Sequence, residues 1–166
     1  MINTRFRELI EHLLAAKVEF ILVGGAAARA LGSPRVTQDL DVVYRRSPEN
    51  LDRLVEALVP LRPYPRGAPQ GLPFRWDRRT LEFGLNFTLV TDFGYIDVLG
   101  EVTGGGYDDL LPNTELIEAF GTRCRCVDLD TLIRLKRAAG RPKDFEAIAE
   151  LELMRDEPDD DAPEPT

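Results

Sequence analysis

Asp39 and Asp41 are the residues of this sequence whose types and spacing most directly indicate chemistry. They lie in the valine-rich segment 39–44, which has the composition of a strand, where alternate residues project from the same face. Two carboxylates on a face that packs against a core repel each other, and a divalent cation between them removes that cost. Their hard oxygen atoms favour Mg²⁺, or Mn²⁺ in its place. An Asp-x-Asp pair also occurs at exposed strand ends, so its surroundings must decide.

A glycine pair, Gly24-Gly25, precedes Asp39 with thirteen residues in between. The pair follows an apolar segment and leads into an alanine-rich one, which predicts a strand passing into a helix. Because glycine has no side chain, the backbone N–H groups there can approach a phosphate, and the positive end of the helix dipole favours the negative charge of that phosphate. The strand, glycine turn, helix and Asp-x-Asp strand together predict a phosphate site beside a metal site.

Asp97 is the third candidate carboxylate, because it is the single acid in the apolar segment 95–99. Chemistry with two metal ions needs a further carboxylate, and Asp97 could supply it. A buried carboxylate is costly by itself, which predicts cationic neighbours around Asp97. The alternative role is that of a structural hydrogen-bond acceptor, and Glu101 and Asp92 are the next carboxylates to consider.

Hydrophobic spacing predicts the elements that must position these residues. Apolar residues recur at helical spacing over 4–16, with Asn3 or Thr4 as the expected cap, and Ser47 before a proline predicts another helix start. Segment 60–73 holds five prolines and two glycines, which indicates an ordered detour or a mobile loop. The remaining patterns predict strands at 18–23, 39–44, 81–90 and 95–99, a hairpin of 116–120 with 123–127, and helices at 26–31, 130–139 and 142–154. Strands between helices indicate an α+β (mixed α/β) domain.

These motifs together resemble the DNA polymerase β-type nucleotidyltransferase superfamily. The resemblance is carried by residues 22–27 (Leu-Val-Gly-Gly-Ala-Ala), 35–41 (Arg-Val-Thr-Gln-Asp-Leu-Asp) and 96–99 (Ile-Asp-Val-Leu). Residues 130–144 are similar to small bacterial single-domain members, including the AbiEii/MenA-like toxins of toxin–antitoxin systems. The resemblance covers roughly residues 4–153.

The resemblance implies a nucleotidyltransferase fold, a central mixed β-sheet flanked by helices, with metal ions at Asp39, Asp41 and Asp97. It implies Mg²⁺-dependent transfer of a nucleoside monophosphate from an NTP such as ATP to an acceptor hydroxyl, with pyrophosphate leaving. The acceptor stays open between tRNA or other RNA, a protein and a small molecule. If the protein is a toxin, an antitoxin is a further partner.

One departure from the family pattern concerns Gly25. Many active members have Gly-Ser where this chain has Gly24-Gly25, so a hydroxyl that would hold a phosphate is missing. Ser33 or Thr37 could substitute, or the backbone alone could serve. The alternative function is therefore a catalytically inactive nucleotide- or partner-binding module of the same fold.

Lys136 and Lys143 lie in the C-terminal segment that resembles the family, and a compact ammonium group suits a triphosphate oxygen. A solvated helix face is the alternative reading of both lysines. Arg35 precedes the Asp-x-Asp strand and could reach the phosphates, and Asp144 could orient Lys143 or Arg141. The expected nucleotide- and phosphate-binding residues are Gly24, Gly25, Arg35, Thr37, Lys136 and Lys143.

Phe74 and Trp76 stand beside Arg75, Arg78 and Arg79. Such a mixture can stack the bases of single-stranded nucleic acid, or it can form an aromatic core with a charged rim. The sequence leaves both readings open.

The composition, with 43% hydrophobic and 30% charged residues among 166, predicts a soluble protein. No apolar run is long enough for a bilayer and the N-terminus does not read as a signal peptide, so we expect a cytoplasmic protein without a membrane partner. We expect one domain over 1–155 and a disordered acidic tail over 156–166; without the six acids of that tail, the formal net charge of −8 falls to −2. Because His12 is the single histidine of the sequence, most His-based catalysis is excluded. Cys124 and Cys126 are expected to be reduced packing residues.

Overall fold

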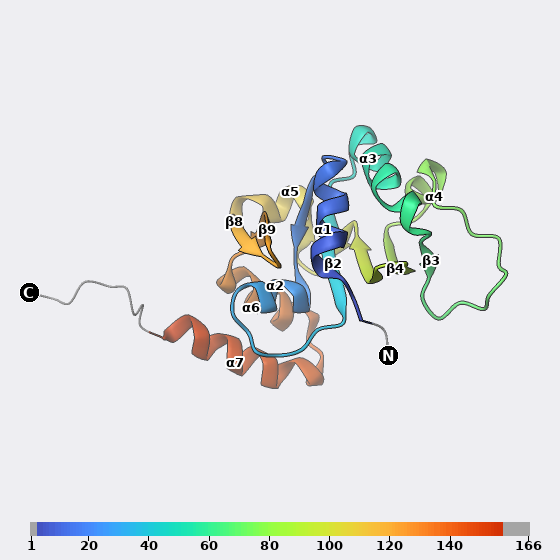
Figure 1. The fold of residues 1–166 in the computed structure, drawn as a ribbon. Coiled ribbons are helices and arrows are strands. Elements are labelled where there is room, and N and C mark those ends of the chain that lie inside the picture. Colours follow the sequence, from blue (N-terminus) through green and yellow to red (C-terminus); the bar gives the residue numbers. More distant parts are fainter. Residues whose placement is uncertain (1–2, 158–166) are drawn as a thin grey trace, which may run out of the picture.

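A mixed seven-stranded sheet forms the centre of the protein, as a computed structural model that describes residues 3–157 shows (Figure 1). The strand order is β3-β4-β5-β2-β1-β9-β8. β2 runs parallel to β5 and β1 parallel to β9, whereas the other neighbours are antiparallel. The strands are β1 (Phe20–Leu22), β2 (Asp39–Tyr44), β3 (Tyr64–Pro65), β4 (Asn86–Thr91), β5 (Gly94–Leu99), β8 (Thr114–Ala119) and β9 (Thr122–Val127), and β6 (Glu101–Val102) pairs separately with β7 (Gly105–Gly106).

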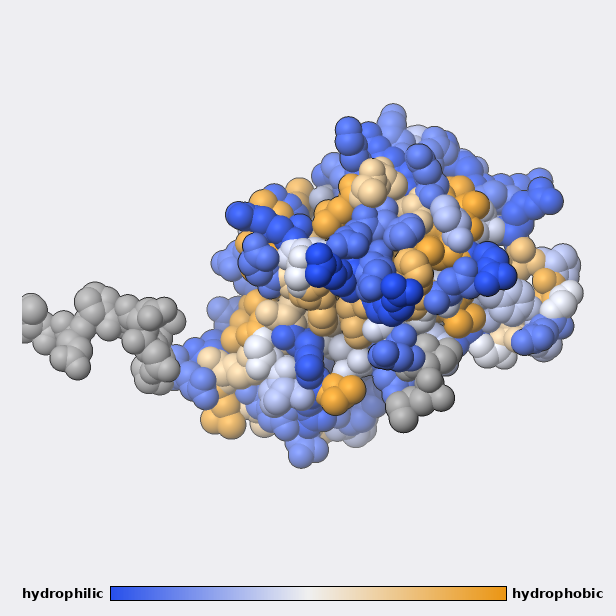
Figure 2. Space-filling model, viewed as in Figure 1, coloured by the Kyte–Doolittle hydropathy of each residue, from blue (hydrophilic) through white to orange (hydrophobic). Residues whose placement is uncertain are grey.

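Helices cover both faces of this sheet, which confirms the predicted fold class. The helices are α1 (Phe6–Ala15), α2 (Gly24–Ala30), α3 (Pro48–Leu58), α4 (Arg78–Phe83), α5 (Tyr107–Leu110), α6 (Leu129–Ala139) and α7 (Phe145–Asp156), with short 3₁₀ turns η1 (Val59–Leu61), η2 (Leu111–Asn113) and η3 (Pro142–Asp144). α1 packs against α3, while α6 packs against both α2 and α7. Within residues 3–157, no helix is long and apolar enough to cross a membrane. The surface in view in Figure 2 is mostly hydrophilic.

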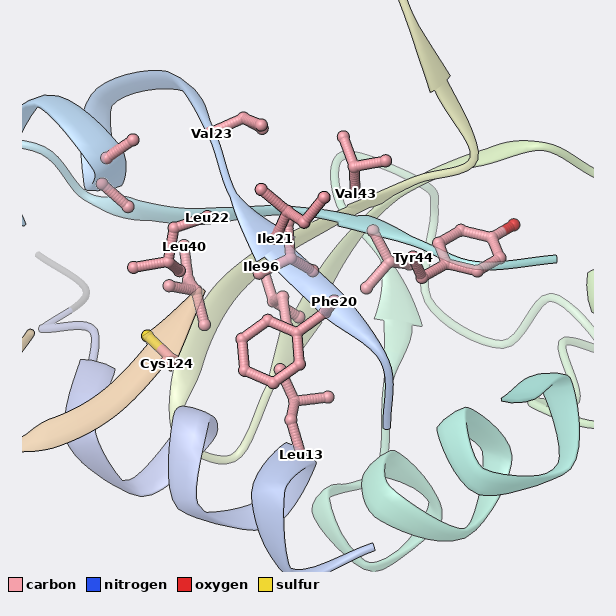
Figure 3. Packing of buried hydrophobic residues seen from close by; sticks show 14 of the residues in the cluster. Leu13, Phe20, Ile21, Leu22, Val23, Leu40, Val43, Tyr44, Ile96 and Cys124 are labelled. Atoms are coloured by element: carbon pink, nitrogen blue, oxygen red, sulfur yellow. The ribbon is translucent and has the colours of Figure 1, made fainter. Parts of the chain in front are cut away.

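Strand alternation divides the interior into two layers and places the aspartates of β2. Figure 3 shows Leu13 of α1 pointing at Phe20 of β1, with Leu40 of β2 on the same side of the sheet, and all three side chains are buried. Because successive side chains of a strand point to opposite faces, Asp39 and Asp41 face away from α1. They face the layer that α2 and α6 cover.

The expected cap of α1 at Asn3 or Thr4 is wrong. Arg5 occupies the cap position, and its side chain makes no capping hydrogen bond. The Thr4 hydroxyl instead donates to the Gln38 carbonyl and accepts a hydrogen bond from the backbone N–H of Tyr95 at 3.1 Å. A tertiary contact between the N-terminal segment and the sheet therefore takes the side chain that local sequence assigns to capping.

The segment 81–90, predicted as one strand, instead contains the end of α4 and the first part of β4. The Asp77 carboxylate accepts a hydrogen bond from the Thr80 N–H at 2.9 Å and so starts α4 as a helix cap. This cap is visible in the sequence, but the prediction gave more weight to the strand-like composition of 81–90. The cap predicted for α3 is confirmed, because the Ser47 hydroxyl accepts a hydrogen bond from the Asn50 N–H at 3.3 Å.

Trp76 belongs to the core. It is buried, its indole N–H donates to the Leu54 carbonyl at 3.3 Å, and its ring meets that of Phe87 edge-on. Of the two readings of this aromatic segment, the structure therefore favours the core with a charged rim. The tail expected over residues 156–166 lies outside the described residues except for Asp156, which still belongs to α7, and Glu157.

Candidate metal and nucleotide site

Asp39, Asp41 and Asp97 come together on one face of the sheet, and we call them the acidic triad. β2 and β5 pair in parallel so that Asp41 lies alongside Asp97, and Asp39 lies two residues earlier on the same face. One carboxylate oxygen from each residue lies within 4.8 Å of the others. The triad thus offers three converging hard oxygen ligands, the donor type that Mg²⁺ and Mn²⁺ take.

The electrostatics of the triad also suit a cation. Burial, followed by the charge of Asp97, raises the pKa of Asp41 to about 8, while a backbone hydrogen bond from Gly25 acts in the opposite direction. Burial likewise raises the pKa of Asp39, against the opposing charge of Arg66. Burial and mutual repulsion make it unfavourable for these carboxylates to lose their protons. A nearby positive charge stabilises their anionic form. Mg²⁺ or Mn²⁺ therefore fits the residues that are present.

Gly24 and Gly25 form the first turn of α2, which starts two residues earlier than predicted. Gly24 has φ +62°, and a Cβ atom there would stand 2.5 Å from Oδ2 of Asp41, so both the backbone conformation and the close approach require glycine. A Cβ atom on Gly25 would stand 2.8 Å from Oγ1 of Thr37. The threonine hydroxyl, which donates to the Asp39 carbonyl at 3.2 Å, therefore occupies space that a serine at position 25 would need.

A cleft of about 810 Å³ contains the triad. Lys136 of α6, together with Arg141 and Lys143 in the segment that follows α6, also lines this cleft. A smaller cavity of about 260 Å³ shares the same three cations and Gly25 with the cleft, and Thr37 lines it. The tertiary structure thus brings the carboxylates of the sheet and the predicted phosphate-binding lysines to one cavity.

Arg35 has a different position from the lysines. It lines the smaller cavity, and its guanidinium group pairs with two carboxylates of α7, Glu150 at 2.6 Å and Glu146 at 3.6 Å. Asp144 is buried and accepts a hydrogen bond from Nε of Arg141 at 2.8 Å. Of the two partners expected for Asp144, the structure therefore selects Arg141.

The remaining candidates lie away from the triad or serve packing. Ser33 is buried and lines the smaller cavity, and Glu101 lines the cleft without joining the group of three carboxylates. Asp92 pairs with Arg62 at 2.8 Å on the surface. His12 lies 2.9 Å from the Glu8 carbonyl through Nδ1, outside the cleft.

Cys124 and Cys126 are free and buried, as expected of packing residues. Burial raises the pKa of Cys124 to about 11 and that of Cys126 to about 12. Both side chains therefore stay protonated thiols at neutral pH.

Sequence reasoning missed Arg66, which lies in the proline-rich segment 60–73. Its Nη2 atom lies 2.9 Å from Oδ1 of Asp97, and its Nη1 atom lies 3.6 Å from Oδ2 of Asp39. The expectation of a cation near Asp97 is thus met. The sequence could not say which arginine provides it, because only the pairing of β3 with β4 brings Arg66 to the triad.

No protein-family model and no curated protein sequence matches the chain. Its three-dimensional structure is similar to that of a presumed nucleotidyltransferase (TM1012) from Thermotoga maritima, with a TM-score of 0.56. The match covers 89% of this chain and 90% of that one, at 14% sequence identity. The chain has a nucleotidyltransferase fold. The fold-level part of the resemblance is confirmed, and the narrower likeness to AbiEii/MenA-like toxins stays a prediction.

Proposed function

We propose that this protein is a metal-dependent nucleotidyltransferase that moves a nucleoside monophosphate from an NTP to a hydroxyl group of an acceptor. The observation that carries the proposal is the acidic triad in one cleft with Lys136 and Lys143. A triphosphate needs positive charge around it, and its metal ions need oxygen ligands from the protein. The cleft offers both, on a fold shared with a presumed nucleotidyltransferase.

Each group in the cleft has a distinct task in this proposal. Mg²⁺ or Mn²⁺ held by Asp39, Asp41 and Asp97 would offset the charge that develops on the triphosphate. Lys136 and Lys143 bind phosphate oxygens through their ammonium groups. Bringing NTP and acceptor together in one cleft makes the reaction effectively unimolecular and reduces its entropic cost.

Asp97 is the proposed base. It accepts the proton of the acceptor hydroxyl while that oxygen forms a bond to the α-phosphorus of the NTP. The bond from the α-phosphorus to the bridging oxygen of the β-phosphate breaks, and pyrophosphate leaves with that electron pair. The side chain of Asp97 is 16% exposed, which leaves its carboxylate reachable from the cleft that it lines.

The absence of a hydroxyl at Gly25 favours the second candidate, a binding module without activity. The position of Thr37 supports the enzyme instead, because its Oγ1 atom would lie only 2.8 Å from a Cβ atom at position 25. We propose that Thr37 provides the hydroxyl that other family members carry on a serine. Arg35 is a weaker candidate for phosphate binding than the two lysines, because its guanidinium group already pairs with carboxylates of α7.

The two candidates are separated by incubating the protein with each labelled NTP, Mg²⁺ and total cellular RNA or protein, and measuring transfer of label. Because the metal ion that accompanies the NTP would depend mainly on Asp39 and Asp41, we expect Asp97→Asn to keep NTP–Mg²⁺ binding within several-fold. We expect it to lose transfer by about 10² or more, the scale of a positioned base. Asp92→Asn is the matched control, because Asp92 pairs with Arg62 on the surface. Full transfer by Asp97→Asn would refute the role of Asp97. A binding module predicts no transfer by the wild type.

We also propose, on the sequence resemblance, that the biological role is that of a toxin whose partner is an antitoxin. Induced expression in a bacterial host should then stop growth, and Asp39→Asn with Asp41→Asn should restore it at equal protein levels. Growth that is unaffected by the wild type, or stopped equally by the double variant, contradicts this role.

A further inference from the structure

The side chain of Arg66 is held at the triad by more contacts than an ordinary surface ion pair has. Its Nη2 atom donates to Oδ1 of Asp97 at 2.9 Å and to the Leu89 carbonyl at 3.1 Å. Its Nη1 atom lies 3.6 Å from Oδ2 of Asp39, and the guanidinium carbon lies 4.2 Å from the centroid of the Tyr95 ring. One guanidinium group therefore contacts two triad carboxylates and is oriented by an aromatic face.

The backbone around Arg66 explains how a residue of the proline-rich segment reaches the triad. Arg66 directly follows β3, and its N–H donates to the Thr88 carbonyl of β4 at 2.9 Å, which extends the β3–β4 ladder by one residue. Thr88 in turn pairs with Asp97 of β5. Arg66 and Asp97 therefore project from the same face of the sheet on either side of β4.

The burial of Arg66 indicates what holds the side chain in place. Only 25% of it is exposed, and nothing among the described residues forms a hydrogen bond with its buried Nε atom. A buried donor without a partner is unfavourable, so the contacts of the two Nη atoms must outweigh it. Those contacts are chiefly with the carboxylates of Asp39 and Asp97, to which the proposed function assigns metal binding.

We infer that Arg66 is the positioning residue of the acidic triad: it takes the place of a divalent cation beside Asp97 and Asp39, and it yields that place when a metal ion binds. The inference rests on the proposed function for the role of the triad. A guanidinium group and a metal ion compete for the same carboxylates, and two cations beside the same carboxylates repel each other. Arg66 therefore keeps the metal-free site assembled and at the same time weakens metal binding.

Calorimetric titration of Mn²⁺ into the metal-free protein tests this competition, in mildly alkaline buffer so that protons compete less. We expect Arg66→Gln to bind Mn²⁺ at least about tenfold more tightly than the wild type, which corresponds to about 1.4 kcal/mol. We expect the metal-free variant to melt at a lower temperature, because its carboxylates lose their counter-ion. Arg66→Met, which keeps a long side chain above Tyr95, should also bind Mn²⁺ more tightly and serves if the glutamine variant does not fold.

Arg62→Gln is the matched control. Arg62 lies on the same segment, its side chain is 83% exposed, and it pairs with Asp92 rather than with the triad, so its Mn²⁺ affinity should equal that of the wild type. Equal or weaker Mn²⁺ binding by the folded Arg66 variant overturns the inference, and so does an equal gain in Arg62→Gln. Asp39→Asn with Asp41→Asn separates the two proposals: if this variant binds Mn²⁺ as the wild type does, the metal site itself is refuted.

Discussion

Replacing Asp41 with asparagine tests the electrostatics of the metal-free triad. The pKa of Asp41 is raised from 3.8 to about 8 in the folded protein, first by burial and then by Asp97. Between these values the folded state holds a proton that the unfolded chain has released. The free energy of unfolding of the wild type should therefore decrease as the pH rises from about 4 to about 8. Asp41→Asn lacks this group, so its curve should lack this contribution.

The magnitude follows from one proton. A difference of one bound proton between the states changes the free energy of unfolding by about 1.4 kcal/mol per pH unit. From pH 5 to pH 7, wild type and Asp41→Asn should therefore diverge by up to about 3 kcal/mol, with the variant gaining stability relative to the wild type. For a domain of this size, 1 kcal/mol shifts the melting temperature by about 2–4 °C, which predicts a divergence of up to about 6–12 °C.

Among the described residues, the carboxylates whose pKa is lowered do not produce this slope. Hydrogen bonds and ion pairs lower the pKa of Glu8, Asp77, Asp92 and Glu150, so their contributions are lost only as the pH falls below about 4. Burial of Asp39 acts in the same direction as burial of Asp41 and is present in both proteins being compared.

The assay is thermal unfolding followed by circular dichroism from pH 5 to pH 8 in buffer with a chelator. Asp108→Asn removes an exposed carboxylate, paired with Arg45 outside the triad, and should run parallel to the wild type. Saturating Mg²⁺ should flatten the wild-type curve, because a bound metal ion displaces the proton from Asp41. Parallel curves for wild type and Asp41→Asn without metal would refute the reasoning.

Further predictions concern phosphate binding, the glycine turn and the thiols. Lys136→Ala and Lys143→Ala should weaken NTP binding more than nucleoside binding in calorimetry, since ammonium groups contact phosphate; an equal loss for both ligands would assign the lysines to folding. Mg²⁺ should raise the melting temperature of the wild type, because it would bind only the folded state. Gly24→Ala should abolish that rise, because its Cβ atom would press on the Asp41 carboxylate. Gly67→Ala, with φ +80° and no atom of the described residues within 4 Å of the added Cβ, should share only the backbone strain. Cys126, buried with a pKa of about 12, should resist alkylation at pH 8 until the protein unfolds; rapid labelling of the native protein contradicts its burial.

Local sequence was sufficient for the features that depend on neighbours along the chain. The shared face of Asp39 and Asp41 follows from strand alternation alone, and the Ser47 cap needs only the first turn of α3. It was insufficient at Thr4, where a contact with β5 outweighed capping. Over 81–90 the local signal was present, because the Asp77 cap starts a helix, but the strand-like composition was given more weight.

Only the tertiary structure decided which residues surround the two aspartates of β2. The parallel pairing of β2 with β5 places Asp97 alongside Asp41, and the pairing of β3 with β4 places Arg66 within hydrogen-bond distance of Asp97. The choice of strand partners depends on the burial summed over the whole sheet, and alternation within one segment carries no information about it. The sequence alone could therefore indicate the chemistry of the triad, whereas its counter-ion and the hydroxyl of Thr37 beside Gly25 required the folded chain.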